Sequence, residues 1–473
     1  MQYFEHLENY DKKSLDLLIV NSTTDQITEK AFWYGISITS ASRIICVMLL
    51  RIGFILVQVG SIPVENVYII IFRNIVEIAM TILTYGFAGF YLSYGKATLY
   101  GFINYGEFIG SEIADLNSAT IGFSACLIST AISCSLLIAR LRQLPILTIT
   151  VLSSGLFIPL LICWCWSKHG WMTQFTLLGK RVSVKDYGGN IVVYLPSATI
   201  GLIGTIFLGR RIVKIKDIDP FSLGKEYVSG TVTGYFFIII GHMGFLLPSE
   251  YYESHREIKD HVSKISVNSL LSVAAGILIT TLLQTLKSKD MYKYWRVIKC
   301  LQGGLAGFIT VSAGIDIYNP VSSFGIAAFG SSLFFLSTYL VHYSPLEDCC
   351  NIISIYLVCS FFGCLIPPLF GNGENLGFSV PNKLRFTHLL WQCVCLLTII
   401  SFIVLPYFLI FFMFFIFGCL KNDFEEVNHE RAKILYGKLP WKRYFDRIFM
   451  ANKSSDISPN VNRDEIGHTY NAP

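Results

Sequence analysis

The chain has 473 residues, of which 53% are hydrophobic and only 15% are charged. Soluble domains carry about 25% charged residues, so this composition excludes an ordinary soluble enzyme and indicates an integral membrane protein. The net charge of +5 is small for this length and gives no support for a nucleic-acid partner.

The first thirty residues are polar and charged, and we expect an extracellular tail over 1–30 rather than a cleavable signal peptide. The tail contains Asn21-Ser-Thr23, which is an acceptor pattern for N-glycosylation if this end of the chain lies outside the cell. Asn21 is therefore a candidate glycosylation site.

Apolar runs long enough to cross a bilayer follow one another along the rest of the chain. They predict an all-α integral membrane protein with eleven transmembrane helices in a domain over residues 31–420. The last run is long enough for a strongly tilted helix. The predicted spans are 34–59, 67–93, 117–139, 144–166, 187–209, 227–248, 263–286, 298–316, 321–342, 349–371 and 387–420.

Basic residues cluster in the loops after the third, fifth and seventh spans, which places these loops on the cytoplasmic side of the membrane. An odd number of spans then puts the N-terminus outside and the C-terminus in the cytoplasm. The tail over 421–473 is charged and carries the aromatic-basic patch Trp441–Tyr444, which is typical of a surface helix. We expect a multi-pass protein of the plasma membrane.

A spacing of an acid and a tyrosine occurs twice, at Asp186 and Tyr194 and again at Asp348 and Tyr356. Eight residues of helix rise about 12 Å, so each tyrosine lies about two turns deeper than its acid. The pairs fall in the fifth and tenth spans. Because five is odd, two five-helix halves would have opposite topology, which predicts an inverted repeat with a pathway between the halves.

Three ionisable residues lie inside predicted spans, where they need a partner or a function. For Arg43 and Arg51 we expect snorkelling or pairing across helices. His242 is either a hydrogen-bonded packing residue or, in a transporter core, a proton-handling one.

Thirteen cysteines lie almost entirely within apolar runs, and pairs such as Cys163/Cys165 are too closely spaced for the usual zinc pattern. We therefore expect buried, reduced thiols and no bound metal. No nucleophile–base pair and no cofactor loop stands out. The sequence predicts neither an enzyme nor a cofactor.

Five segments, in order over about residues 30–420, resemble motifs of the ammonium transporter/Rhesus (Amt/Mep/Rh) family. They are Gly53–Asn66 with Arg73-Asn74, Trp164–Trp171, Asp186–Ala198, Gly241–Phe245 and Gly303–Gly314. The resemblance implies a homotrimer in the lipid bilayer, in which each subunit has a narrow pore for ammonium or ammonia between its inverted halves.

The resemblance also implies roles for single residues. Trp166 would be the vestibule aromatic that attracts a small cation, and Ser249 would be the vestibule hydroxyl. Phe245 would be one of two gate phenylalanines. Asp186 would be the family's structural acid. Its position just before the fifth span also predicts that it caps the start of that helix.

Several positions depart from the family pattern. Tyr194 and Tyr356 stand at the positions of the twin pore histidines, so this is a divergent member that lacks both. Ala125, a candidate vestibule residue, stands where the second gate phenylalanine is expected, and Phe123 replaces that ring only if the alignment slips. His242 stands where a tryptophan is usual.

These departures leave three hypotheses open. Tyrosine has an unperturbed pKa near 10 and relays protons poorly at pH 7, although His242 could supply a base. The first hypothesis is an ammonium or ammonia transporter or channel with an altered pore. The second is a transport-deficient ammonium sensor or regulatory subunit of the same fold. The third is a pore retuned to another small solute, such as a methylamine, carbon dioxide or water.

Overall fold

The computed structural model describes residues 38–422 apart from short gaps, at 62–66, 96, 107, 112–114, 138–139, 168, 178, 210–227, 249–254, 288–293, 345 and 371–384. The chain divides into two compact units, Met1–Asp423 and Phe424–Pro473. Asn21, Ser249 and almost all of the predicted C-terminal tail lie outside the described residues.

Nine helical segments in the described part of the chain are long and apolar enough to cross a membrane. Five of them contain no π-helical turn. The first spans Ile38–Ser61, and two others are α4 (Leu116–Ser135) and α11 (Pro320–Tyr343). The long α9 (His255–Lys287) contains the segment Val262–Leu286, and α14 spans Arg385–Ile416.

The other four segments each contain a π-helical turn, in which the backbone hydrogen bonds widen locally. The turns are η2 (Tyr85–Gly89) between α2 (Val67–Thr84) and α3 (Phe90–Tyr94), η3 (Ser153–Phe157) between α5 (Gln143–Leu152) and α6 (Ile158–Trp166), η4 (Asn190–Tyr194) before α7 (Leu195–Leu208), and η7 (Ile353–Val358) before α12 (Cys359–Leu365) and α13 (Pro367–Phe370).

Two further helices, α8 (Val228–Phe245) and α10 (Tyr294–Ser312), coincide with the two remaining predicted spans. The all-helical prediction missed two short antiparallel hairpins. Strand β1 (Ala97–Leu99) pairs with β2 (Ile103–Tyr105), and β3 (Phe175–Leu177) pairs with β4 (Lys180–Val182). Both lie in connections, where three-residue strands carry too little alternating pattern to be read from the sequence.

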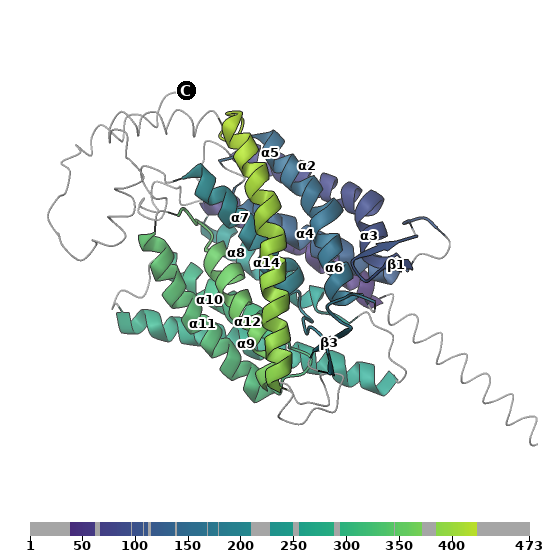
Figure 1. The fold of residues 1–473 in the computed structure, drawn as a ribbon. Helices are drawn as coiled ribbons and strands as arrows, with labels where there is room; N and C mark the ends of the chain where they lie inside the picture. The colour runs from purple at the N-terminus through teal and green to yellow at the C-terminus, as the bar shows by residue number, and fades with distance from the viewer. Residues whose placement is uncertain are drawn as a thin grey trace, which may run out of the picture. The chain divides into compact units, whose positions relative to one another are not determined.

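Two groups of helices can be distinguished in the packing (Figure 1). Helices α9, α10 and α11 pack against one another, whereas α7 packs against α4 and α14. Turn η4 contacts α12, and turn η7 contacts α7, so the two segments that begin with these turns cross each other. This crossing brings the fifth and tenth predicted spans together.

Helix α4 is buried on nearly all sides although it contains many serines and threonines. Their hydroxyls donate to carbonyls one turn earlier, for example from Thr130 to Cys126 and from Ser133 to Ser129. This local bonding satisfies the hydroxyls and lets a polar helix sit inside the bundle.

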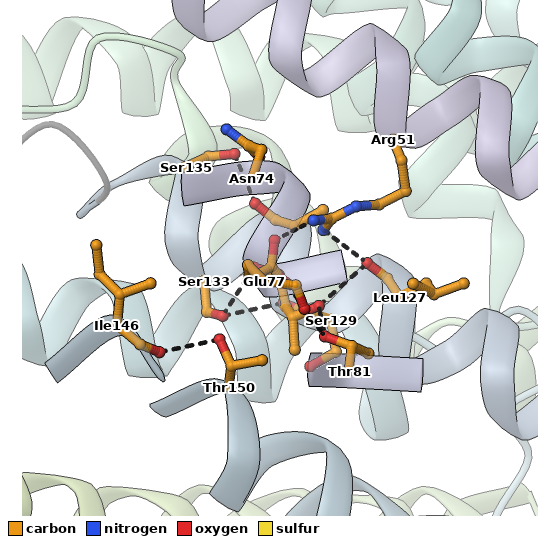
Figure 2. Close-up of polar contacts among 12 residues, drawn as sticks. Arg51, Asn74, Glu77, Thr81, Leu127, Ser129, Ser133, Ser135, Ile146 and Thr150 are labelled. Carbon is orange, nitrogen blue, oxygen red and sulfur yellow. Dashed lines mark hydrogen bonds and ion pairs between the residues drawn. The ribbon is translucent and has the colours of Figure 1, made fainter. Parts of the chain in front are cut away.

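A buried ion pair lies beside α4 (Figure 2). Arg51 of the first helix donates to the Glu77 carboxylate of α2 and to the Leu127 carbonyl of α4, and both charged side chains are almost fully buried. Thr81 donates to the same carboxylate. Arg51 therefore pairs across helices, which was one of the two interpretations of its position. Arg43 does the same with the Thr120 hydroxyl.

Candidate functional site

The two acid-to-tyrosine segments begin with the same local structure. Asp186 accepts backbone N–H bonds from Asn190 at 2.7 Å and from Ile191 at 2.9 Å. Asp348 accepts equivalent bonds from Ile352 and Ile353, both at 2.8 Å. In each case the carboxylate satisfies the N–H groups four and five residues later, which would otherwise be unpaired at a helix start.

Burial sets the protonation of the Asp186 cap. It raises the pKa of this carboxyl from 3.8 to about 6, because the charged form loses its hydration. The N–H groups of residues 189–192 act in the opposite direction, since they stabilise the carboxylate. Gly189 has a φ of +82°, a conformation that favours glycine, and this bend turns the backbone into η4.

The π-helical turns place the two tyrosines. Turn η4 ends at Tyr194, and the next turn of chain contains Pro196, which has no N–H to donate to a carbonyl four residues earlier. Turn η7 contains Tyr356 at its centre. Such turns are frequent at functional sites because they displace a side chain from ordinary helical register.

Tyr194, His242 and Tyr356 form one hydrogen-bonded unit, called here the Tyr–His–Tyr unit. The Tyr194 hydroxyl lies 3.1 Å from Nδ1 of His242, and the Tyr356 hydroxyl lies 2.9 Å from Nε2. All three side chains are at most 1% exposed. A neutral imidazole has one donor and one acceptor nitrogen, so one phenol donates to His242 and the other accepts from it.

The rings of this unit fill the space where the two crossing segments meet α8. The Tyr194 and His242 ring centroids are 5.2 Å apart, and those of Tyr194 and Tyr356 are 5.8 Å apart. Phe308 packs against His242 and Phe54 against Tyr356. The three residues assigned to the pore centre from the sequence are therefore in mutual contact.

Trp166 and Phe245 lie together close to the Asp186 cap. Their ring centroids are 6.3 Å apart, and the Trp166 indole N–H donates to the Asp186 carbonyl at 2.8 Å. We call the region between these two rings the Trp166 mouth. Ser249, which was expected to supply a hydroxyl to this region, lies outside the described residues.

The other two candidates for this region lie elsewhere in the packing. Phe123 packs edge-on against Tyr85, with the ring centroids 4.7 Å apart. No ring contact joins Phe123 to Trp166 or Phe245 in the part of the chain that the structure describes. Ala125 is fully buried within α4.

Sequence reasoning missed the residues that fix the segment around Asp186. Gln392 of α14 bonds the Lys185 backbone twice, accepting from its N–H at 3.1 Å and donating to its carbonyl at 2.8 Å. The Tyr187 hydroxyl donates to the Leu246 carbonyl at 3.1 Å. The available signal was an amide side chain, Gln392, inside the long apolar run over 387–420.

The protein-family model for the Ammonium Transporter Family matches residues 38–434, which is most of the chain. The chain belongs to the ammonium transporter family. The resemblance found in the motifs is thus confirmed, and with the nine apolar helices it makes this a multi-pass membrane protein. The matching proteins are transporters and not enzymes.

Individual relatives are distant. The chain is 22% identical over 321 residues to "Ammonium transporter 3" of Dictyostelium discoideum, covering 67% of this chain and 71% of the relative. It is also 22% identical over 403 residues to "Putative ammonium transporter 1" of Caenorhabditis elegans, covering 78% and 72%. At this identity, divergence at single positions is expected.

Two solved structures share the fold. One is described as "Sensor Amt Protein", with a TM-score of 0.70 and 18% identity over 83% of this chain and 96% of that chain. The other is Saccharomyces cerevisiae Mep2, with a TM-score of 0.65 and 17% identity over 79% and 84%.

Proposed function

We propose that this protein conducts ammonium or ammonia across the membrane through a pore whose centre is the Tyr–His–Tyr unit. The observation that carries the proposal is the position of this unit. It lies where the two Asp-capped segments cross, in a chain of the ammonium transporter family. Ammonium and ammonia are the substrates that the family assignment supports.

The proposed architecture has eleven spans in two inverted five-helix repeats, followed by α14 as the eleventh. The equivalent caps at Asp186 and Asp348 support the repeat, as do the reciprocal contacts of η4 with α12 and of η7 with α7. We further propose a homotrimer in the plasma membrane, with tail 1–30 outside, membrane domain 31–420 and tail 421–473 in the cytoplasm.

At the Trp166 mouth, the faces of Trp166 and Phe245 would attract a small cation, because aromatic faces carry negative charge density. Ser249 would add a hydroxyl contact. With Ala125 at the second vestibule position, this mouth would offer one aromatic face fewer, and Phe123 packs against Tyr85 instead. We therefore expect weaker cation recruitment than with two phenylalanines.

At the pore centre, His242 is the one group of the Tyr–His–Tyr unit that titrates near neutral pH in its unperturbed state. It would take the place of the missing twin histidines as a proton acceptor. Both of its nitrogens are bonded to phenols, so a substrate nitrogen reaches the imidazole only when one of these hydrogen bonds opens. Conduction would then depend on the exchange of a phenol for the substrate.

The second candidate function is a transport-deficient ammonium sensor or regulatory subunit. The same unit favours it, because three buried, mutually bonded side chains close the centre of the proposed pore in this state. A sensor would bind ammonium at the Trp166 mouth without passing it on.

One experiment separates the two candidates. The protein is expressed in cells that lack their own ammonium uptake, and growth on low ammonium is measured beside a Tyr194→His/Tyr356→His double variant. Growth with the wild-type chain would contradict the sensor candidate. Growth with the double variant alone, at equal membrane expression, would contradict transport and show that the tyrosines block the pore.

A further inference from the structure

A lysine adjoins Asp186, whose carbonyl accepts the indole N–H of Trp166. Lys185 directly precedes the Asp186 cap, and its Nζ forms an ion pair with Oδ2 of Asp316 in the turn after α10. The same Nζ lies 5.8 Å from the centroid of the Tyr187 ring. A cation within about 6 Å of an aromatic centroid is attracted by the ring face. One carboxylate and one ring thus surround this ammonium.

The Asp316 carboxylate has unused acceptor capacity. Its side chain is only 9% exposed, whereas that of Lys185 is 25% exposed. Oδ1 of Asp316 is buried and has no hydrogen-bond partner among the residues that the structure describes. A carboxylate has about four lone-pair sites, so a lysine on one oxygen leaves room for further N–H donors. An unpaired buried acceptor is unfavourable, which favours a donor at this position.

The groups around this ammonium are held in place by the backbone. The two Gln392 bonds fix Lys185, and the Tyr187 N–H donates to the Ala313 carbonyl at 2.9 Å, three residues before Asp316. The Tyr187 hydroxyl bonds the Leu246 carbonyl, next to Phe245. Tyr187 is therefore bonded to the segment that carries Asp316 and to the residue that follows Phe245.

We propose that Asp316 and the Tyr187 ring form a site for a small ammonium-type cation, and that the Lys185 ammonium occupies this site as a tethered competitor. This inference rests on the proposed function, since the cation would be the substrate or its methylated analogue. An N–H-bearing cation can make the same two contacts as Lys185, a hydrogen bond to the carboxylate and an approach to the ring face.

Local charge favours exchange over joint occupancy. Lys264 of α9 lies within electrostatic range of both Asp316 and Lys185, so two lysines already face one carboxylate. A further cation would meet like charge unless Lys185 leaves. The lysine would thereby lower the apparent affinity of the Asp316–Tyr187 site for ammonium.

The test uses the full-length protein purified in detergent and methylammonium as the probe. Binding is followed by calorimetry for wild type, Lys185→Met, Lys185→Arg and Lys185→Met/Asp316→Asn. A competitor on a short tether has an effective concentration in the millimolar range. Loss of the competing lysine ammonium should therefore lower the Kd for methylammonium by about tenfold. Lys185→Arg keeps a cation on Asp316 and should bind as wild type does. The double variant should lose the gain, because the carboxylate is gone.

Equal or weaker binding by Lys185→Met would overturn the inference, provided that its thermal unfolding matches that of Lys185→Arg. A gain in methylammonium affinity that persists in the double variant would also overturn the inference. So would the absence of any methylammonium binding by both wild type and Lys185→Met. Uptake in cells is measured in parallel. Uptake by wild type without a change in Kd on Lys185→Met contradicts the site but not the proposed function. A gain in binding without any uptake contradicts transport but not the site.

Discussion

His242 Nε2 lies 2.9 Å from the Tyr356 hydroxyl, although the two residues are 114 positions apart in the chain. The other imidazole nitrogen is bonded to Tyr194. One side chain therefore joins Tyr194 and Tyr356, the two positions at which the motif resemblance predicts the family's pore histidines. The properties of this unit can be tested by changing His242 alone.

The substitution His242→Leu should destabilise the protein more than His242→Gln. Leucine leaves two buried phenols without a partner, at about 1–3 kcal/mol for each. Glutamine has both a donor and an acceptor and can keep one or both bonds. Thermal unfolding in detergent, followed by tryptophan fluorescence, measures the difference. Equal unfolding midpoints for the two variants would show that the hydrogen bonds contribute little.

The Arg51–Glu77 pair should behave as a unit. Removing one partner by Arg51→Met or Glu77→Leu leaves the other group buried without its partner, and loss of one member of a buried pair costs about 3–5 kcal/mol. The double variant Arg51→Met/Glu77→Leu removes both groups and should recover much of this loss. Unfolding of the four proteins forms a double-mutant cycle. Additive losses would contradict the coupling.

Stability should depend on pH through Asp186. Its folded-state pKa of about 6 lies above the value of 3.8 for the free group, so the folded state binds more protons between these values. The contribution of this proton is fully present below pH 3.8 and is lost as the pH rises through about 6. Wild type should therefore lose stability between about pH 4 and 6 relative to Asp186→Asn. An unchanged difference between the two proteins across this range would contradict the raised pKa.

Phe245 and Phe123 should have different effects when truncated. Phe245→Ala removes a ring that faces Trp166, so methylammonium should bind more weakly. Phe123→Ala removes a ring that packs on Tyr85, so it should lower the unfolding midpoint and leave binding unchanged. Calorimetry and thermal unfolding of both variants make the comparison. Weaker binding in Phe123→Ala would place this ring at the mouth after all.

Much of the fold could be predicted from the sequence, because hydrophobic runs and the positions of acids are local signals. The predicted span over 144–166 corresponds to Gln143–Trp166, and that over 321–342 to Pro320–Tyr343. The equal spacing of Asp186 to Tyr194 and of Asp348 to Tyr356 also predicted that the two segments share a local structure. Both carboxylates accept the backbone N–H four residues later. The count of eleven spans remains a prediction, since nine segments meet the length and hydropathy expected of a span in the described chain.

The contacts between distant segments could not be predicted in the same way. The rotation of α8 decides whether His242 faces the tyrosines, and this helix is apolar on nearly all sides, so its sequence does not indicate which face turns inward. Lys185 and Asp316 are 131 positions apart and had no motif in common. The π-helical turns shift side chains by a fraction of a turn, which hydrophobic periodicity does not resolve.

The central claim is that this chain transports ammonium through the Tyr–His–Tyr unit. The most direct measurement is the initial rate of labelled methylammonium uptake, with unlabelled ammonium as competitor, in cells that lack their own uptake. Wild type should show saturable methylammonium uptake that ammonium inhibits. The variant His242→Leu should have a different initial rate of uptake. A wild-type rate equal to that of cells without the protein, at confirmed surface expression, would contradict the central claim.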